Sequence, residues 1–223
     1  MHGKMTLLLE EVAERIDWKP WIEKILREMY TIGGTILFPK HPKNINGQRG
    51  MNPMKRLPEI TEQVLGQEEK MKELAGMLKD QRDAYFIGRQ LDYPTALEGA
   101  LKLKEISYVH ADAYYAGELK HGPIALIEKD TVVTAMATQP EVASKTVSNI
   151  RETIARGARV ILITGENMPA EEFEYVVRIP EISPELAAIP SAVLLQMFAY
   201  YGAKEKGCDI DKPRNLAKSV TVE

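Results

Sequence analysis

The chain has 223 residues, a length that fits one α/β domain with an extension or two small domains. Hydrophobic residues make up 44% of it, as in ordinary soluble proteins, and 29 basic against 32 acidic side chains give a net charge of −3, which argues against a dedicated nucleic-acid binder. No apolar run reaches the roughly 18 residues that span a bilayer, no signal peptide is recognisable, and the single Cys208 excludes an internal disulfide and a paired-cysteine zinc site. We therefore expect a cytoplasmic protein that contacts neither membrane nor nucleic acid.

Residues 5–30 have the spacing of amphipathic helices, with Pro20 marking a kink or a new helix start. The acidic residues among them disfavour a membrane surface, so we expect these helices to pack on a domain or a partner. Residues 40–56 carry five basic residues and no acidic one, among prolines and glycines, which is typical of a solvated linker. We therefore predict a helical extension with a basic linker over residues 1–56, and a separate domain over residues 57–223.

The predicted domain alternates between apolar runs and segments of helical periodicity. The apolar runs predict four strands, at residues 84–88, 131–136, 159–164 and 175–179. The periodic segments predict helices over residues 57–79, from Pro94 onward, over 144–156 and over 190–206. Strands without polar alternation, separated by helices, predict an α/β fold with a mostly parallel sheet flanked by helices on both faces.

The helix that begins at Pro94 has two distinct stripes. One is small and apolar, which suits close packing on a sheet or another helix: Ala96, Ala100, Leu103 and Ser107, with Leu97 and Leu101 beside them. The other places Lys102 between the carboxylates of Glu98 and Glu105. This charged stripe is either a set of solvated ion pairs, each contributing a few tenths of a kcal/mol, or part of a functional site.

The carboxyl ends of the strands are the edge at which open parallel sheets bind ligands. The first predicted strand ends at Gly88 and delivers Arg89 and Gln90 to that edge, where the Pro94 helix also begins. We therefore expect a ligand site there, built from the stretch over residues 93–123, with Arg89 as a substrate-binding residue.

Two motifs carry a resemblance to a known family. The stretch ALEGALKLKEISYVHADAYYAGELKHGP and the C-terminal DIDKPRNLAKSVTVE resemble the second sugar-isomerase (SIS) domain of glucosamine-6-phosphate synthase, the isomerising glutamine–fructose-6-phosphate aminotransferase. The resemblance runs from Leu57 to Glu223, whereas residues 1–56 do not resemble the family. It implies an SIS-type, flavodoxin-like fold and the conversion of fructose 6-phosphate to glucosamine 6-phosphate in amino-sugar synthesis, and we expect no cofactor and no metal.

The resemblance also implies roles for individual side chains. Glu105 would be the carboxylate that moves a proton between C1 and C2 of the sugar, and Lys102 would support it. Lys218 matches the lysine that forms an imine with the ketone. His121 matches the histidine of ring opening, which the family supplies from the neighbouring subunit, so a homodimer is expected.

The C-terminal segment would form a loop over the sugar, and its backbone at Ala217 and Ser219 would contact the substrate. The alternative interpretation of Glu105 is that it only forms an ion pair with Lys102. Both can hold together, because the cation would keep the carboxylate in its charged, proton-accepting form.

Two parts of the family pattern are not found in this sequence. One is the glutaminase domain, whose catalytic cysteine follows the initiator methionine, whereas His2 stands here. The other is the first SIS domain, with the Ser/Thr-rich loop that holds the sugar phosphate. Ser144, Thr146 and Ser148 come nearest to such a loop, but we interpret them as the cap and surface of a helix.

Three interpretations remain open on the sequence alone. The chain is a half-enzyme whose missing domains come from a partner chain, or a stand-alone domain that binds or slowly isomerises a sugar phosphate. In the third interpretation it is a truncated, non-catalytic module that only binds a sugar phosphate or dimerises. The presence of Glu105, His121 and Lys218 favours the first two, and the missing phosphate loop favours the third.

Overall fold

The computed structural model describes residues 53–214. The predicted helical extension therefore lies, except for its last residues, outside the described part. The same holds for three site residues of the C-terminal segment, namely Ala217, Lys218 and Ser219.

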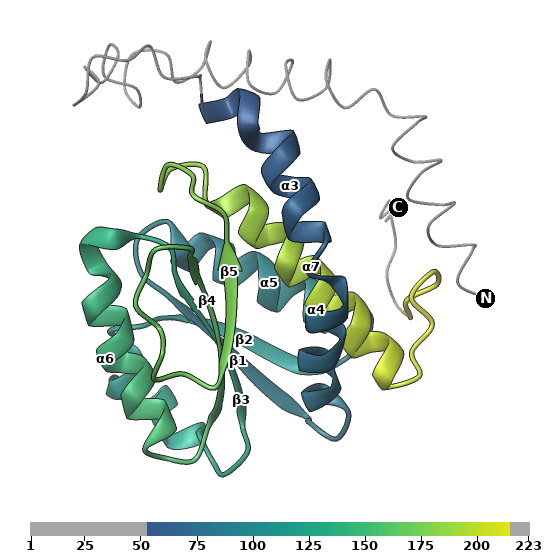
Figure 1. The fold of residues 1–223 in the computed structure, drawn as a ribbon. Helices are drawn as coiled ribbons and strands as arrows, with labels where there is room; N and C mark the ends of the chain where they lie inside the picture. Colours follow the sequence, from purple (N-terminus) through teal and green to yellow (C-terminus); the bar gives the residue numbers. More distant parts are fainter. Residues whose placement is uncertain (1–52, 215–223) are drawn as a thin grey trace, which may run out of the picture. The chain divides into compact units, whose positions relative to one another are not determined.

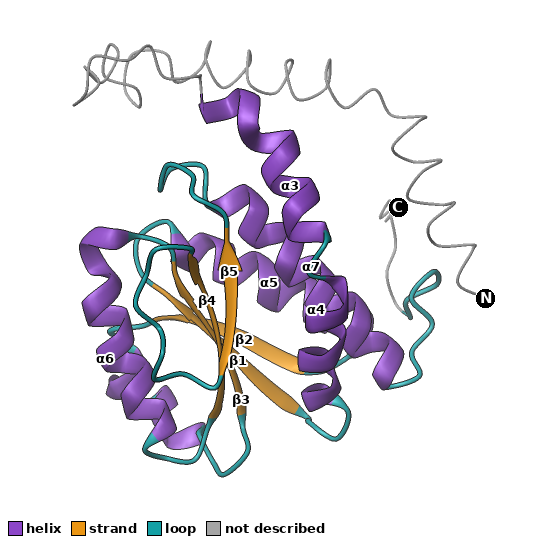
Figure 2. Cartoon of the chain, in the orientation of Figure 1, coloured by secondary structure: helices purple, strands orange, loops and turns teal. Residues whose placement is uncertain are grey.

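A single five-stranded parallel sheet forms the centre of the described chain (Figures 1 and 2). Its strands are β1 (Asp83–Gly88), β2 (His110–Tyr115), β3 (Val132–Ala137), β4 (Arg159–Gly165) and β5 (Tyr175–Ile179), in the spatial order β2-β1-β3-β4-β5. All four strand pairs are parallel. The predicted parallel sheet is thus confirmed, and the order is that of flavodoxin-like folds.

Helices cover both faces of the sheet, as predicted. They are α3 (Leu57–Leu65), α4 (Glu68–Ala75), α5 (Asp92–Ser107), α6 (Ala143–Ile154) and α7 (Ala188–Glu205). Helix α6 lies on one face against β3 and β4, whereas α5 packs on β1 and β2 on the other face and contacts α7 along its length (Figure 1). Helices α3 and α4 pack in turn on α7. No helix in the described part is long and apolar enough to cross a membrane.

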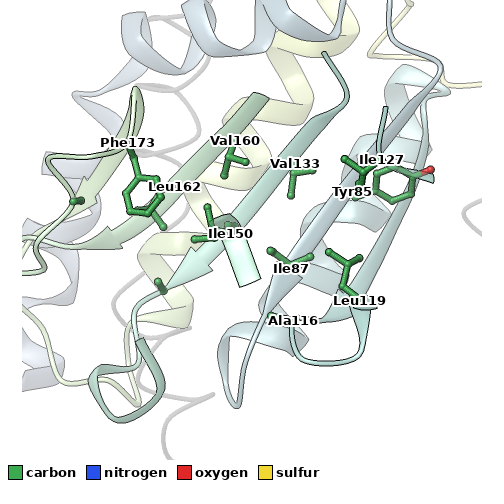
Figure 3. Close-up of a cluster of buried hydrophobic side chains, with 13 residues drawn as sticks. Tyr85, Ile87, Ala116, Leu119, Ile127, Val133, Ile150, Val160, Leu162 and Phe173 are labelled. Carbon is green, nitrogen blue, oxygen red and sulfur yellow. The ribbon is translucent and has the colours of Figure 1, made fainter. Parts of the chain in front are cut away.

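The core beneath α6 is built from alternate residues of the inner strands (Figure 3). Tyr85 and Ile87 of β1 point to this face, together with Val133 of β3 and Leu162 of β4, and Ile150 of α6 closes the cluster. All six residues of β3 are buried. Burial on both faces explains why the inner strands appear in the sequence as continuous apolar runs.

The small stripe of α5 packs as expected. Ala96, Ala100, Leu103 and Ser107 are all buried. Gly99 allows α5 to approach α7 closely, because a Cβ atom at this position would come within 2.7 Å of Leu195 Cδ1. The two leucines predicted beside the stripe are not buried with it, because Leu97 and Leu101 are 45% and 42% exposed.

Three elements differ from the sequence-based expectation. Strand β2 was not predicted, since HADAYY is polar and aromatic. It is an edge strand with one fully buried residue, a position that tolerates polar side chains. The helix predicted over residues 57–79 is interrupted after α3 by Gly66 and Gln67. Helix α5 begins at Asp92, so Pro94 is its third residue, still within the first turn, where no intrahelical N–H bond is lost.

Candidate active site

The charged stripe of α5 forms the predicted ion pairs near the end of the helix. Lys102 Nζ lies 2.9 Å from Glu105 Oε2 and 3.6 Å from Glu98 Oε1, at spacings of three and four residues. The hydrogen bond to Glu105 raises the pKa of the Lys102 ammonium; burial opposes this rise and the charge of Glu98 adds to it. The side chains of Lys102 and Glu105 are 33% and 28% exposed, so the pair is held at the surface and is accessible to a ligand.

Helix α5 carries Glu105 away from the carboxyl edge of the sheet. The helix starts beside the end of β1 and returns along the sheet to the beginning of β2, so its last turn lies at the amino edge. Glu105 follows Asp92 by thirteen positions, which corresponds to roughly 20 Å along a helix. The structure therefore separates residues that the sequence pattern placed at one edge.

Arg89 lies at the carboxyl edge, where it was expected, but it is bound to its own chain. Its Nη2 and Nε atoms donate to Asn149 Oδ1 of α6 at 2.8 and 3.3 Å. Its guanidinium also lies 5.5 Å from the centre of the Tyr115 ring at the end of β2. A Cβ atom at Gly117 would come within 2.7 Å of Nη2, so the glycine makes room for the guanidinium. Arg89 thus connects three elements at this edge.

A buried carboxylate occupies the point where the chain order reverses, between β1 and β3. Asp92 is 2% exposed and accepts hydrogen bonds from the backbone N–H and the hydroxyl of Thr138, which follows β3. Burial raises the pKa of Asp92, and the hydrogen bonds from Thr138 oppose that rise. Gln139 Nε2 extends the network to Thr138 Oγ1 and to the Pro184 carbonyl, at 3.2 and 3.0 Å.

This reversal point is the usual ligand position in sheets of this order. Here the first turn of α5 fills it. A Cβ atom at Gly88 would lie 2.6 Å from the carbonyl carbon and oxygen of Asp92, so the backbone at the end of β1 packs directly on the backbone of the first turn of α5. The sequence pattern did not indicate Asp92 or Thr138, and the one local signal was an acidic residue two positions before the predicted helix start at Pro94.

His121 lies at the opposite edge of the sheet from Glu105. It closes the short 3-10 helix Leu119–His121, which follows the carboxyl end of β2, and it is exposed. Glu105 precedes the amino end of the same strand, and six residues of strand extend roughly 20 Å. Within one chain these two side chains are not brought together.

The C-terminal segment returns to the end of α5. After α7 the chain places Cys208 Sγ 3.7 Å from the Ser107 carbonyl. Further on, the Arg214 N–H donates to the Tyr108 hydroxyl at 2.8 Å, and its guanidinium lies 4.1 Å from the centre of the Tyr108 ring. The last described residue therefore lies beside the helix end that carries Glu105.

The hydroxyls of α6 do not form an anion loop. Ser144 and Ser148 are exposed, as expected for a helix surface, whereas Thr146 is buried and donates to the Val142 carbonyl at 3.2 Å. No side-chain hydrogen bond caps the helix at Val142, contrary to the expected cap. Among the described residues, no group of three or more His, Cys, Asp or Glu side chains is placed to hold a metal ion.

Comparison with known proteins places this arrangement in a family. Residues 77–203 match the model of the SIS domain. The glutamine–fructose-6-phosphate aminotransferase [isomerizing] of Clostridium acetobutylicum is 52% identical over 172 residues, covering 76% of this chain and 28% of that protein. The Thermus thermophilus protein of the same name is 49% identical over 178 residues, covering 79% of this chain and 30% of its own length.

Solved structures agree with these relatives. The C-terminal domain of glucosamine-fructose-6-phosphate aminotransferase from Francisella tularensis superposes with a TM-score of 0.67 at 35% identity, covering 71% of this chain and 45% of that one. The tagatose-6-phosphate ketose/aldose isomerase from Escherichia coli shares the fold at a TM-score of 0.61 and 18% identity, covering 81% of this chain and 50% of that one. The chain thus spans less than a third of the length of the curated relatives named above. The resemblance seen in the sequence motifs is confirmed, and the chain belongs to the SIS domain family.

Proposed function

We propose that this chain supplies the isomerase half of a glucosamine-6-phosphate synthase, which converts fructose 6-phosphate to glucosamine 6-phosphate. Curated relatives whose sequences are 52% and 49% identical to this chain carry the name of that enzyme. The observation that carries the proposal is the return of the C-terminal segment, through Arg214 on Tyr108, to the helix end that holds Glu105 and Lys102. The described chain thus ends beside a carboxylate held by a cation, and Lys218 follows Arg214 by four residues in the sequence.

In the proposed reaction the Nζ of Lys218 attacks the C2 ketone of the open-chain sugar and releases water as an imine forms. Ammonia, supplied by the glutaminase of a partner chain or domain, then displaces the Lys218 amine from C2 and leaves an imine on the sugar. The Glu105 carboxylate takes a proton from C1 and returns it to C2 on the same face, while the C1 hydroxyl loses its proton and the imine nitrogen gains one, which leaves an aldehyde at C1 and an amine at C2. Lys102 holds the carboxylate in place through the 2.9 Å contact. The backbone at Ala217 and Ser219 contacts the sugar.

The position of His121 supports a site that two subunits share. In one chain it lies across the sheet from Glu105, too far for both to touch one sugar ring. A second copy of the chain would bring the partner's histidine to the first copy's carboxylate, where it opens the ring. We therefore propose a homodimer in which each site combines residues of both chains.

The buried Asp92, at the point between β1 and β3 where the strand order reverses, supports the proposal that the sugar phosphate is bound by residues outside this chain. Because the Asp92 carboxylate takes the hydrogen bonds that Thr138 would otherwise offer to an anion, this edge does not favour a sugar phosphate. Arg89 is likewise paired with Asn149. We propose that the phosphate is held by a partner chain or domain that carries the first SIS domain and the glutaminase, in the cytoplasm.

The test is binding of fructose 6-phosphate and glucosamine 6-phosphate by calorimetry, with unphosphorylated sugars as controls, followed by borohydride reduction and mass spectrometry. We expect a sugar phosphate adduct that forms on the wild-type chain and is absent in Lys218→Ala. Binding without an adduct contradicts catalysis through Lys218 and favours a non-catalytic binding or dimerisation module. Absence of binding contradicts a complete site in this chain alone and leaves the phosphate to the partner chain or domain.

A further inference from the structure

The carboxyl group of Asp92 is held by hydrogen-bond donors of the two residues that follow β3. The backbone N–H of Thr138 donates to Asp92 Oδ2 at 2.9 Å, and the Thr138 hydroxyl donates to Oδ1. Burial raises the pKa of Asp92, and hydrogen bonds from the side chains and backbone N–H groups of Thr138 and Gln139 oppose that rise. Backbone N–H groups and hydroxyls that converge on one point are the donors with which proteins bind oxyanions. We call these donors of Thr138 and Gln139 the β3 cradle.

The turn between β1 and α5 delivers Asp92 to the β3 cradle at a conformational cost. Gln90, within this turn, has φ 51°, in the left-handed region that is unfavourable for a residue with a Cβ atom. Asp92, Thr138 and Gln139 are all buried, so the carboxyl group is removed from water and depends on the cradle for its hydrogen bonds. The side chain of Asp92 therefore lies in the β3 cradle as a bound anion would.

Two further features of this edge favour a negatively charged ligand. The β3 cradle lies between β1 and β3, at the point where the strand order reverses, which is the usual ligand position in such sheets. Arg89, three residues before Asp92, directs its guanidinium to neutral groups, the Asn149 amide and the Tyr115 ring. These contacts do not neutralise its charge, so an anion at this edge lies in a positive field.

We propose that Asp92 is a specificity-determining residue whose carboxyl group occupies an oxyanion site, the β3 cradle, and excludes phosphate groups from it. This inference deepens the proposed function and rests on it for the identity of the excluded substrate, a sugar phosphate. The donors of the cradle suit a phosphate monoester, because backbone N–H groups and a hydroxyl can each bond one of its oxygens. With the cradle filled from within, the domain supplies proton transfer and leaves phosphate binding to another domain.

The decisive variant is Asp92→Gly, because it removes the whole side chain and frees the donors of Thr138 and Gln139. The probe is inorganic phosphate at about pH 8, where it is mostly a dianion. Binding is measured by calorimetry and by the melting temperature, at constant ionic strength set with chloride. We expect the variant to bind phosphate at least about tenfold more tightly than the wild type, the effect of a hydrogen bond to a charged group. If the variant is unfolded in chloride, phosphate should refold it, because a ligand of the folded state stabilises that state.

Two controls separate this site from the general stabilising effect of phosphate on proteins. Asp130→Gly removes an exposed aspartate whose φ is 67°, and it should respond to phosphate as the wild type does. Thr138→Val, added to Asp92→Gly, removes one donor and should weaken phosphate binding about tenfold. Equal phosphate binding by the wild type and Asp92→Gly, in calorimetry and in melting, would overturn the proposal. Undiminished binding after Thr138→Val would do the same, because the phosphate would then lie elsewhere.

Competition identifies the excluded ligand. Fructose 6-phosphate should displace inorganic phosphate from Asp92→Gly, whereas fructose should not. Displacement by neither sugar would limit the site to free phosphate and overturn the role of Asp92 in excluding a sugar phosphate.

The phosphate measurement uses neither a sugar nor Lys218, so it distinguishes this inference from the proposed function. If Asp92→Gly gains a phosphate site while the wild type forms no adduct with fructose 6-phosphate, the β3 cradle is confirmed and the proposed function fails. If the wild type forms the adduct and Asp92→Gly gains no phosphate site, only the role of Asp92 fails.

Discussion

At the scale of single residues, Lys102 distinguishes two carboxylates that look equivalent in the sequence. Glu105 accepts its hydrogen bond at 2.9 Å, whereas Glu98 lies at 3.6 Å and is more exposed. Only Glu105 is also close in sequence to Tyr108, on which the C-terminal segment is anchored. The pair with Lys102 and the proposed proton transfer are therefore compatible, since the cation orients the same carboxylate that would act as the base.

Replacing Glu105 with glutamine tests that carboxylate. If the site turns over, Glu105→Gln should reduce proton exchange at C1 and C2 by at least about a hundredfold, because an amide cannot take up the proton. The measurement is deuterium incorporation from heavy water into the sugar phosphate, followed by NMR, with circular dichroism as a check of folding. Glu98→Gln is the matched control and should exchange at close to the wild-type rate. Undiminished exchange in Glu105→Gln would remove this residue from the mechanism.

The buried Asp92 predicts a pH dependence of stability. Burial raises its pKa in the folded state above the ordinary 3.8, so the folded protein holds this proton more tightly than the unfolded chain. The stabilisation from Asp92 is therefore complete below pH 3.8 and is lost as the pH rises through the raised folded-state pKa. The free energy of unfolding of the wild type minus that of Asp92→Asn, from urea titrations, should fall over this interval. A difference that rises with pH would mean that the hydrogen bonds from Thr138 outweigh burial.

At the scale of elements, the contact between β1 and α5 determines the shape of the carboxyl edge. The helix begins within four residues of the strand, and its first turn lies against Gly88 with no space for a side chain. The same helix is pressed onto α7 at Gly99. Glycines at both places allow α5 to pack closely against β1 and α7, and Asp92 at the start of the helix lies within hydrogen-bonding distance of Thr138.

Two glycine substitutions test this packing. Gly88→Ala should lower the free energy of unfolding by about 1–3 kcal/mol, because its Cβ would meet the Asp92 backbone at 2.6 Å and backbone cannot move aside as a side chain can. Gly76→Ala is the control, since nothing lies within 4 Å of the added Cβ and φ is −56°. It should be neutral or stabilising by up to about 1 kcal/mol. Equal effects in chemical denaturation would contradict the close approach of α5 to β1.

At the scale of the whole molecule, the proposed site needs residues from opposite edges of the sheet. Glu105 stands at the amino edge and His121 beyond the carboxyl edge, with the full length of β2 between them. No local rearrangement of one chain removes a separation of that size. For the proposed site to be complete, a second copy of the chain would have to supply the histidine, with the two edges meeting across the proposed interface.

Mixing two inactive variants tests the shared site. In a dimer of one Glu105→Gln chain and one His121→Ala chain, one site has lost both residues and the other retains both. Random mixing after unfolding and refolding should restore about a quarter of the wild-type activity, since half of the dimers are mixed and each has one intact site of two. Each variant alone stays inactive. No recovery, with mixed dimers demonstrated by mass, would mean that His121 acts within its own chain or not at all.

The alternation of buried strands with periodic helices was sufficient to predict the α/β class, four of the five strands and the small stripe of α5. Those signals are local, because the burial pattern of a strand or helix repeats within a few residues. The edge strand β2 carried no such signal, since only one of its residues is fully buried. The Glu105–Lys102 pair was predictable for the same local reason, as it needs only helical spacing.

The sequence by itself determined the layers of the fold, the charged stripe of α5 and, through its motifs, the family. Only the tertiary structure decided that Asp92 fills the reversal point, that Arg89 is paired with Asn149, and that Tyr108 holds Arg214. These contacts join residues 46, 60 and 106 positions apart. No periodicity spans such distances, because they depend on how β1, α5 and α7 pack, and packing depends on the shapes of all the side chains between them.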